Sequence, residues 1–303
     1  MKTLFYLLLL PLLFVGEVFG KSPAVFTIGT YNLRNANKQD SLNGNGWGQR
    51  SPFIAKLVMF HGFDIFGTQE GLCHQLQDLK KLMPEYEYIG VARDDGKEKG
   101  EYSAIFYRKG KFKLLDHGDF WLSKDESKPN LGWDAVCIRI CTWGKFQEIS
   151  TGRVFVFFNL HMDHKGIVAR EESSKLILKK IQEMPEGIPV VLTGDFNVSQ
   201  FSPSYQLLNT SGKLRDAYDK SPLRYDPAGT FNGFNPEGSS SDERIDHIFL
   251  TDQFSVLKYG ILSDTYRVDQ PKLSGEPANR SSRSFSARCP SDHFPVMIVV
   301  GLP

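Results

Sequence analysis

The sequence has few of the residues that would indicate a disulfide-rich or zinc-binding protein. Only four cysteines occur in 303 residues, at positions 73, 137, 141 and 289. They form no C-x-x-C pair and no cluster with histidine, so nothing in the sequence indicates a structural zinc site. Cys137 and Cys141 lie in one strand-like run, where about 13 Å separates residues four apart, which is too far for a disulfide between them.

The chain also lacks an excess of one charge and a long apolar segment. Lysine and arginine total 36 against 35 aspartate and glutamate, for a net charge of +1. This balance excludes the general basic field that drives non-specific nucleic-acid binding, so recognition of a phosphate must depend on local groups. Beyond the N-terminal region no segment is long and apolar enough to span a bilayer. There is no internal repeat or low-complexity tract.

A short apolar run stands at the N-terminus. It combines Lys2, an apolar stretch from Leu4 to Val15, and small residues at Val18 and Gly20. This pattern predicts a cleaved signal peptide over residues 1–20, rather than an N-terminal anchor, and therefore a secreted or periplasmic protein. Residues 21–303 are expected to form a single domain.

The rest of the chain alternates β-branched and aromatic runs with occasional helical stretches. The strand candidates include AVFTIGTYNL, DIFGTQE, AVCIRICTW, RVFVFFNLHM, IPVVLTGDFN, RIDHIFL and FPVMIVV. Apolar residues at helical spacing predict core-facing helices near residues 53–58, 72–83 and 168–184. The irregular order predicts mixed sheets with helices outside them. Residues 35–49 and 266–290 look like long loops.

Polar side chains stand at the ends of the predicted strands. Those at C-terminal ends are Asn32, Glu70, His161, Asp195 and Asn197. Those at strand starts are Glu101, Asp246, Asp292 and His293. Taken singly, each could be a turn former, a helix cap or a half-buried histidine. If the second set of strands runs antiparallel to the first, however, all of these groups reach one rim.

A shared rim has an electrostatic consequence. Several carboxylates crowded at one mouth repel one another, and a bound cation or paired histidines are needed to hold them there. Oxygen ligands without cysteine favour a hard ion, so we expect Mg²⁺, with Mn²⁺ or Ca²⁺ as alternatives.

Six motifs in order resemble the endonuclease/exonuclease/phosphatase family, which has the DNase I-like fold. They are YN at 31–32, QE at 69–70, HMD at 161–163, GDFN at 194–197, RIDHIF at 244–249 and SDHFPV at 291–296. They span nearly the whole mature chain, which is thus similar to secreted bacterial-type members. The resemblance implies an α/β (α+β) protein, a four-layer α/β/β/α sandwich with two mixed β-sheets. It also implies metal-dependent hydrolysis of phosphoester bonds.

The resemblance further implies which residues meet the metal and the phosphate. Glu70 is implied as the principal metal ligand, supported by Asn32 and Asp292. Asn197 is implied as a hydrogen-bond donor to the phosphate. The chemistry is coherent, because a divalent cation stabilises the charge that develops on phosphoryl oxygens.

Proton transfer is implied for the remaining polar residues. His293 would act on the attacking water, oriented by Asp246, in the way that a carboxylate fixes the tautomer of a catalytic histidine. Asp195 would also position that water. His161 would stabilise phosphoryl oxygens or act as a general acid, with Glu101 as its carboxylate partner.

The sequence indicates the substrate less clearly than it indicates the chemistry. Phe231, in GTFNGF before RIDHIF, could stack a base at the mouth or pack in the core, and Arg139 and Asn197 are the other candidates for substrate contact. We expect a nuclease acting on nucleic acid or nucleotides. The alternatives are a phosphatase or phosphodiesterase acting on sugar phosphate, inositol phosphate or phospholipid, and a non-catalytic binding protein with the same fold. Beyond a phosphoester substrate, no protein partner is inferred.

Overall fold

The computed structural model describes residues 23–237, 241–269 and 284–303. The expected signal peptide, residues 1–20, lies outside these ranges. Among the described residues, none of the helices combines the length and the apolar character needed to cross a bilayer.

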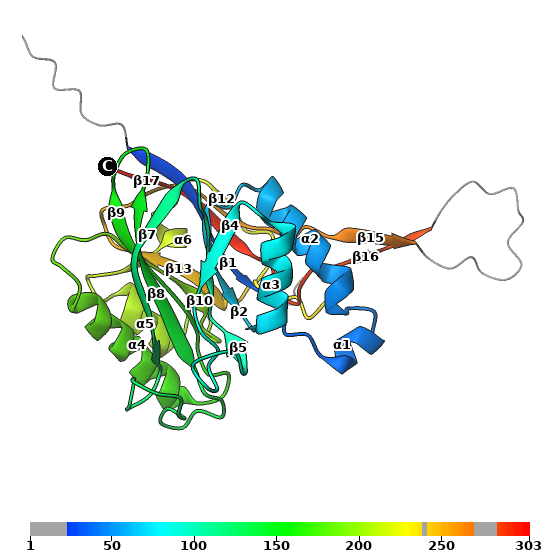
Figure 1. The fold of residues 1–303 in the computed structure, drawn as a ribbon, viewed down its shortest axis with the longest axis horizontal. Helices are drawn as coiled ribbons and strands as arrows, with labels where there is room; N and C mark the ends of the chain where they lie inside the picture. The colour runs from blue at the N-terminus through cyan, green and yellow to red at the C-terminus, as the bar shows by residue number, and fades with distance from the viewer. Residues whose placement is uncertain (1–22, 238–240, 270–283) are drawn as a thin grey trace, which may run out of the picture.

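Two mixed β-sheets form the centre of the molecule (Figure 1). The first has seven strands, in the order β12 (Arg224–Tyr225), β14 (Ser255–Ile261), β17 (Val296–Leu302), β1 (Ala24–Asn32), β2 (Ile65–Gln69), β6 (Ile105–Arg108) and β4 (Tyr86–Ile89). The second has six, in the order β11 (Arg215–Asp216), β13 (Asp246–Leu250), β10 (Val190–Asp195), β9 (Val154–His161), β8 (Ile140–Glu148) and β7 (Phe112–Trp121). Two short ribbons pair β3 (Gly71–Leu72) with β5 (Glu101–Tyr102), and β15 (Tyr266–Asp269) with β16 (Phe285–Arg288).

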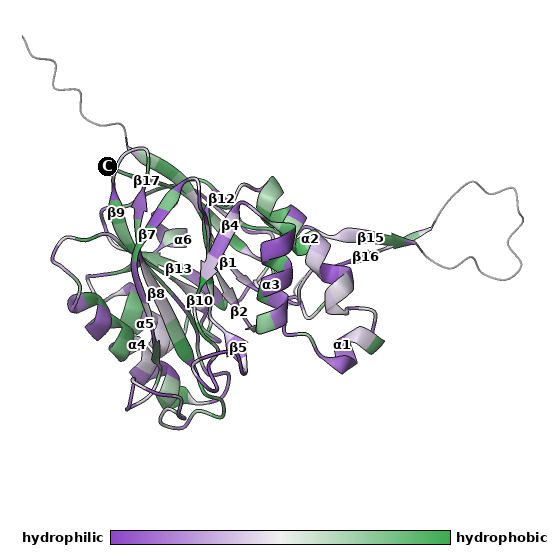
Figure 2. Cartoon of the chain, viewed as in Figure 1, coloured by the Kyte–Doolittle hydropathy of each residue, from purple (hydrophilic) through white to green (hydrophobic). Residues whose placement is uncertain are grey.

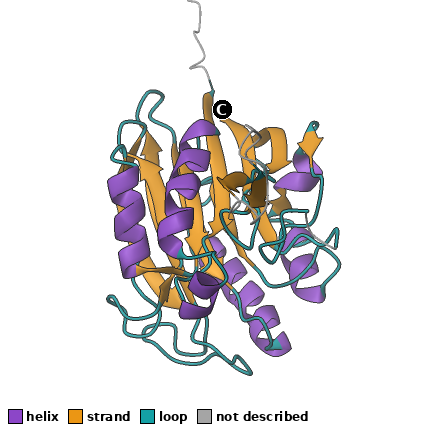
Figure 3. Cartoon of the chain, turned by 90° about the vertical axis from the view of Figure 1, so that its right-hand side faces the viewer, coloured by secondary structure: helices purple, strands orange, loops and turns teal. Residues whose placement is uncertain are grey.

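Helices cover the outer faces of the two sheets, as Figures 1 and 3 show. The longer ones are α2 (Trp47–Phe60) and α3 (Cys73–Leu82) on the first sheet, and α4 (Ile167–Gln182) and α5 (Pro203–Asn209) on the second. The short helices are α1 (Lys38–Leu42) and α6 (Ala217–Lys220). The predicted helical stretches at 53–58, 72–83 and 168–184 fall in α2, α3 and α4. The four-layer α/β/β/α sandwich predicted from the sequence is confirmed.

Three apolar layers hold these elements together. Along β9, Phe155 and Phe157 enter the core between the sheets, while Val156 and Phe158 face the helices on the outside. Alternate side chains point to opposite faces of a strand, and here both faces are covered. The strand therefore reads as a continuous apolar run (Figure 2 shows apolar residues along the central strands).

The strand directions bring the polar ends to one edge. Strands β1 and β2 are parallel, as are β9 and β10, so the C-terminal ends of each pair lie together. Strand β17 runs antiparallel to β1, and β13 runs antiparallel to β10, so the starts of β17 and β13 reach the same edge. The antiparallel arrangement that the sequence required for a shared rim is present.

One predicted strand begins later than expected. The run AVCIRICTW predicts a strand from residue 135, but β8 starts at Ile140. The backbone amides of Val136 and Cys137 instead donate to the carboxylate of Asp163, which takes them out of the ladder. Cys137 therefore lies in a loop and Cys141 in the strand, and all four cysteines, each within the described ranges, are free thiols.

The two segments expected to be long loops contain regular structure. Residues 35–49 include α1, whose N-cap Asn37 accepts a hydrogen bond from the amide of Asp40, and the start of α2. Residues 266–290 include the paired strands β15 and β16, and Tyr266 stacks on Phe53 of α2 with ring centroids 4.0 Å apart. Residues 270–283 of this segment lie outside the described ranges.

A buried polar network joins the two sheets just below the polar edge. The Asn159 amide of β9 donates to the carbonyls of Thr68 (2.8 Å) and Ala104 (3.0 Å) in the opposite sheet. Its oxygen accepts from Gln69 Nε2 (2.8 Å) and Thr193 Oγ1 (3.0 Å). A Cβ on residue 67 would stand 2.2 Å from this oxygen, so the close approach of the sheets requires Gly67.

Replacing Asn159 with Ala should lower the free energy of unfolding by about 2–4 kcal/mol, because it leaves buried donors and acceptors in both sheets without partners. Urea unfolding followed by fluorescence measures the change. Asn43→Ala, at an exposed position where the side chain makes one exposed hydrogen bond, is the control and should change stability by less than about 0.5 kcal/mol. Equal stability of N159A and the wild type would contradict the role assigned to this network.

Candidate active site

The edge where the strand ends meet is hollowed into a pocket of about 510 Å³. The predicted site residues that line it are Glu70, Glu101, Arg139, His161, Asp195, Asn197, Phe231, Asp292 and His293. Asn32 and Asp246 are buried and contact this group from below. The structure thus brings together all the residues that the sequence singled out.

Asn32, the last residue of β1, is the centre of the site. Its Nδ2 atom lies 2.9 Å from Asp195 Oδ2, 3.2 Å from Glu70 Oε1 and 3.4 Å from His293 Nε2. Its oxygen accepts a hydrogen bond of 3.0 Å from the backbone amide of Arg34. Asn32 therefore presents a nitrogen, not an oxygen, to the carboxylates, and its observed contacts are those of a residue that orients them. Its assignment as a metal ligand stays a prediction.

Glu70 enters the pocket through an unusual backbone conformation. It follows β2 with φ = 62°, in the left-handed region that residues with a Cβ seldom adopt. This turn directs the carboxylate toward Asn32, and the backbone amide of Asn35 donates to Oε2 at 3.1 Å. Asn197 has a similar conformation after β10, with φ = 53°. Strained positions of this kind persist where the surrounding structure determines them, commonly in functional sites.

Asp292 supplies a second carboxylate on the same side of the pocket. Burial raises the pKa of Asp292; the charge of Glu70 also raises it, while Arg34, with Nη1 3.5 Å from Oδ2, lowers it. Two carboxylates that disfavour each other's charge suit a divalent cation between them. Because the donors are oxygens, Glu70 and Asp292 fit a hard ion such as Mg²⁺.

His293 and Asp246 form a buried pair. Asp246 Oδ2 lies 2.9 Å from His293 Nδ1, and Nε2 of the ring is 3.8 Å from Asp195 Oδ2. Burial lowers the pKa of His293, but the charge and hydrogen bond of Asp246, with the charges of Asp195 and Asp292, raise it well above the ordinary value. Burial, followed by the charge of Asp246, raises the pKa of Asp195 to about 7. His293 therefore holds its proton beside these carboxylates, and Asp195 can bind or release one near neutral pH.

One ligand atom from each of Asp195, Asp246 and His293 lies within 4.8 Å of the other two. Nδ1 of the imidazole is taken by Asp246, and Nε2 faces Asn32. The group is therefore better suited to moving a proton than to holding a cation.

The pKa of His161, at the end of β9, is shifted in the opposite direction to that of His293. Burial lowers its pKa well below the ordinary value, and the charges of Arg139 and Arg93 lower it further. Nε2 lies 3.5 Å from Asp195 Oδ2, while Nδ1 has no hydrogen-bond partner among the described residues. The ring is neutral at neutral pH and free to bond a substrate oxygen.

The expected pairing of Glu101 with His161 is not a hydrogen bond. Glu101 Oε2 is 3.9 Å from His161 Nδ1 and forms an ion pair with Arg93 instead. The other oxygen accepts from Asn35 Nδ2 at 3.1 Å. Burial raises the pKa of Glu101 and the charge of Arg93 lowers it. Glu101 thus links the loop that carries Arg93 to the loop that carries Asn35.

The three candidate substrate contacts differ in how exposed they are and in how many of their polar atoms are already hydrogen-bonded. Arg139 is buried at the pocket wall, and its Nε and Nη1 atoms have no hydrogen-bond partner in the described part of the chain. Phe231 is 49% exposed and stands with its ring 5.1 Å from that of His293. Asn197 Nδ2 donates to the carbonyl of Met162 at 3.0 Å.

Several pocket residues were not found from the sequence. Arg34, Asn35, Arg93, Cys137 and His164 all line the cavity. None belongs to a recognisable motif, and their approach depends on how the loops fold. The one available signal is that Asn35 begins a segment expected to be a long loop.

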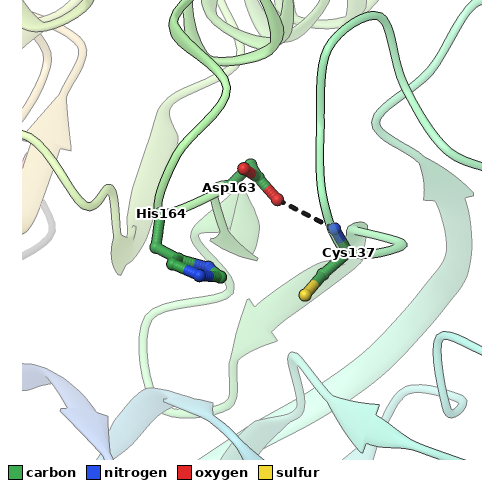
Figure 4. A group of neighbouring side chains, drawn as sticks. All are labelled: Cys137, Asp163 and His164. Carbon is green, nitrogen blue, oxygen red and sulfur yellow. Dashed lines mark hydrogen bonds between the residues drawn. The ribbon is translucent and has the colours of Figure 1, made fainter.

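Cys137, Asp163 and His164 lie close enough to suggest a second metal site, but their bonds argue against it (Figure 4). Both oxygens of Asp163 accept backbone amide hydrogen bonds, from Val136, Cys137, Lys165 and Gly166 at 2.8–3.1 Å.

The Arg139 guanidinium adds a second obstacle there. Its Nη2 is 3.1 Å from His164 Nδ1, and its Nε is 3.7 Å from Asp163 Oδ2. A guanidinium in this place repels a cation. The cluster therefore fixes the loop that carries Arg139.

Comparison with known proteins assigns a family to this arrangement. The sequence pattern of the endonuclease/exonuclease/phosphatase family matches residues 29–293. A solved structure of an endonuclease/exonuclease/phosphatase family protein from Bacteroides thetaiotaomicron is 51% identical, with a TM-score of 0.87 over 93% of this chain and 99% of that one. The structure of a mannosyl-6-phosphatase from Bacteroides thetaiotaomicron VPI-5482 is also 51% identical, with a TM-score of 0.85 over 91% of this chain and 99% of that one.

Curated relatives are more distant. Tyrosyl-DNA phosphodiesterase 2 of Homo sapiens is 25% identical over 58% of this chain and 42% of its own length. Carbon catabolite repressor protein 4 homolog 3 of Arabidopsis thaliana is 27% identical over 65% of this chain and 45% of its own length. The chain spans less than half the length of these two relatives.

Replacing Asp246 with Asn should lower the pKa of His293, because the amide keeps a partner at Nδ1 but removes the negative charge. The wild-type ring keeps its proton to a pH well above 6.5, whereas the variant ring loses it at a lower pH. An NMR titration of the His293 ring in EDTA measures both midpoints. Asp264→Asn, which alters the exposed pair of Asp264 and His61, is the control. The same His293 midpoint in D246N and the wild type would refute the assignment.

Proposed function

The chain belongs to the endonuclease/exonuclease/phosphatase family, and we propose that it is a divalent-metal-dependent phosphatase that removes the 6-phosphate of mannose or a closely related sugar. Hydrolysis of phosphoester bonds is the chemistry of the family. The observation that carries the finer proposal is 51% identity to a mannosyl-6-phosphatase over 91% of this chain. The nucleic-acid substrate expected from the sequence has weaker support, from the similarity to a tyrosyl-DNA phosphodiesterase at 25% identity.

The charges around the pocket support a compact phosphate monoester. Arg34, Arg93 and Arg139 line one cavity, and guanidinium groups bind phosphate oxygens with paired hydrogen bonds. A monoester carries up to two negative charges on one group, which suits this concentration of arginines. A polynucleotide needs positive charge spread along a surface, and the net charge of +1 gives no sign of it. A cavity of about 510 Å³ is of a size that suits a small ligand such as a sugar phosphate.

The residues of the pocket divide the work of hydrolysis. A divalent cation held by Glu70 and Asp292 would act as a Lewis acid toward the phosphoryl oxygens. His293 would receive the proton of the attacking water at Nε2 when its ring is neutral, and Asp246 would stabilise the imidazolium that results. A cation at Glu70 and Asp292 would favour the neutral ring, because it would offset the carboxylate charges that raise the pKa of His293. Asp195, whose pKa is about 7, holds the water next to this ring.

Other residues meet the phosphate and the sugar. Neutral His161 offers its ring to a phosphoryl or leaving-group oxygen, and Asn197 adds an amide donor without adding charge. The half-exposed ring of Phe231 stands beside His293 and gives the apolar face of a sugar a surface to pack on. An aromatic ring in this place would also accept a nucleobase, so nucleic acids belong among the substrates to be tested.

Export is part of the proposal. The support is the sequence pattern of residues 1–20, a lysine followed by a short apolar stretch and small residues at the cleavage position. A secreted or periplasmic phosphatase would act on sugar phosphates outside the cytoplasm.

The purified protein should release phosphate from mannose 6-phosphate in Mg²⁺ or Mn²⁺ and stop in EDTA. Glu70→Gln should lower kcat/KM at least about 100-fold, because it removes a charged ligand of the cation. Glu85→Gln, at an exposed position, is the matched control. Phosphate release is compared across mannose 6-phosphate, glucose 6-phosphate and inositol phosphates, and cleavage across single-stranded DNA, RNA, poly(A) and sphingomyelin. Faster cleavage of a nucleic acid or sphingomyelin than of any sugar phosphate would overturn the proposal.

A further inference from the structure

Arg50, in the first turn of α2, has an unusual environment for a charged side chain. It is fully buried, and its guanidinium hydrogen-bonds to no carboxylate among the described residues. It donates to four backbone carbonyls instead: Nε to Asn45 at 2.8 Å, Nη1 to Leu33 and Pro290 at 2.8 Å each, and Nη2 to Arg34 at 3.0 Å.

Three of these carbonyls belong to the two segments that carry the acidic side of the pocket. Those of Leu33 and Arg34 directly follow Asn32, where β1 ends, and that of Pro290 stands two residues before Asp292. The same two segments also meet where Ser291 Oγ donates to the carbonyl of Asn32 at 2.6 Å. One guanidinium thus spans the end of β1 and the entry to β17.

The guanidinium also touches the loop at the mouth. It lies between the rings of Trp47 and Phe234, 5.5 Å and 5.3 Å from their centroids. Phe234 follows Asn232 and Gly233, whose amides donate to the carbonyl of Asp292 at 2.8 and 3.0 Å. The loop that carries Phe231 into the pocket is therefore anchored on Arg50 as well.

A charge in this position is costly for folding. A buried ion without a paired counter-ion loses its hydration, and here burial lowers the pKa of Arg50. An apolar residue of similar volume would avoid this cost but could not donate to four carbonyls from one plane. The stability gained from packing alone does not account for an arginine at this point.

We propose that Arg50 is a positioning residue for the cation site. It holds the segments around Asn32 and Asp292 at the separation at which Glu70 and Asp292 bind one ion. Arg50 touches neither the ion nor the substrate and acts through the backbone. This inference rests on the proposed metal-dependent hydrolysis, but not on the identity of the sugar.

The test compares Arg50→Met, which keeps the volume and removes the donors, with Arg50→Lys, which keeps a charge and some of the donors. Mg²⁺ titration by calorimetry should show about a 10-fold or larger rise in the dissociation constant for R50M, and a smaller one for R50K. With mannose 6-phosphate, kcat should fall by a similar factor while KM changes less than about 3-fold. Arg108→Met is the control, because Arg108 lies over the ring of Tyr86 at 5.4 Å and is no part of the pocket.

Thermal unfolding in EDTA separates positioning from a purely structural role. A folded R50M protein with wild-type Mg²⁺ affinity and kcat would overturn the inference. If R50M does not fold, the R50K variant provides the test. Lowered stability of R50K with unchanged Mg²⁺ affinity would show that Arg50 serves folding alone. The Mg²⁺ titrations of the wild type and the variants use no sugar. Their comparison therefore tests the role of Arg50 even if the substrate is not a sugar phosphate.

Discussion

The amide of Asn159 joins the two sheets at the level from which Asn32, Glu70, His161 and Asp195 project. Thr30, Asn159 and Thr193 each stand two residues before Asn32, His161 and Asp195 on the same strand, and therefore on the same face. Gln69, which bonds both Thr30 and Asn159, immediately precedes Glu70. The polar network thus sets the spacing between the sheets, and the site residues lie one layer above it. Gly67 allows this spacing because any side chain there would strike Asn159.

In the pocket above this network, the surroundings of each ionisable side chain shift its pKa and so set its charge. Two histidines within reach of Asp195 have pKa values shifted in opposite directions, His293 upward by Asp246 and neighbouring carboxylates, and His161 downward by burial and two arginines. Such separation gives one ring the character of a proton carrier and the other that of a neutral hydrogen-bonding group. Glu70 and Asp292 lie on one side of the pocket, with Arg34 beside Asp292, and Arg93 and Arg139 lie near His161 and Glu101. A cation and a phosphate can therefore meet between them.

Much of this was readable from the sequence, for a physical reason. Polar residues at the ends of apolar strands are costly unless they serve a site, so Glu70, Asp195 and His293 stood out, and six motifs in order indicated the sandwich. Residues that act through loops gave no such signal. The backbone bonds of Arg50 and the ion pair of Arg93 with Glu101 depend on three-dimensional contacts between distant segments. Asn159 was hidden because one amide in an apolar run looks like any other interruption.

The chemistry assigned to the pocket depends most on Glu70 and Asp292, which the antiparallel strands bring together around one cation. Crystals of the protein soaked with Mn²⁺ and phosphate test it through anomalous diffraction. The account predicts one strong peak within coordination distance, about 2.0–2.6 Å, of oxygens from both carboxylates, with phosphate beside it near His161. A peak at Cys137 and His164, or between Asp246 and His293, with none at Glu70, would contradict it.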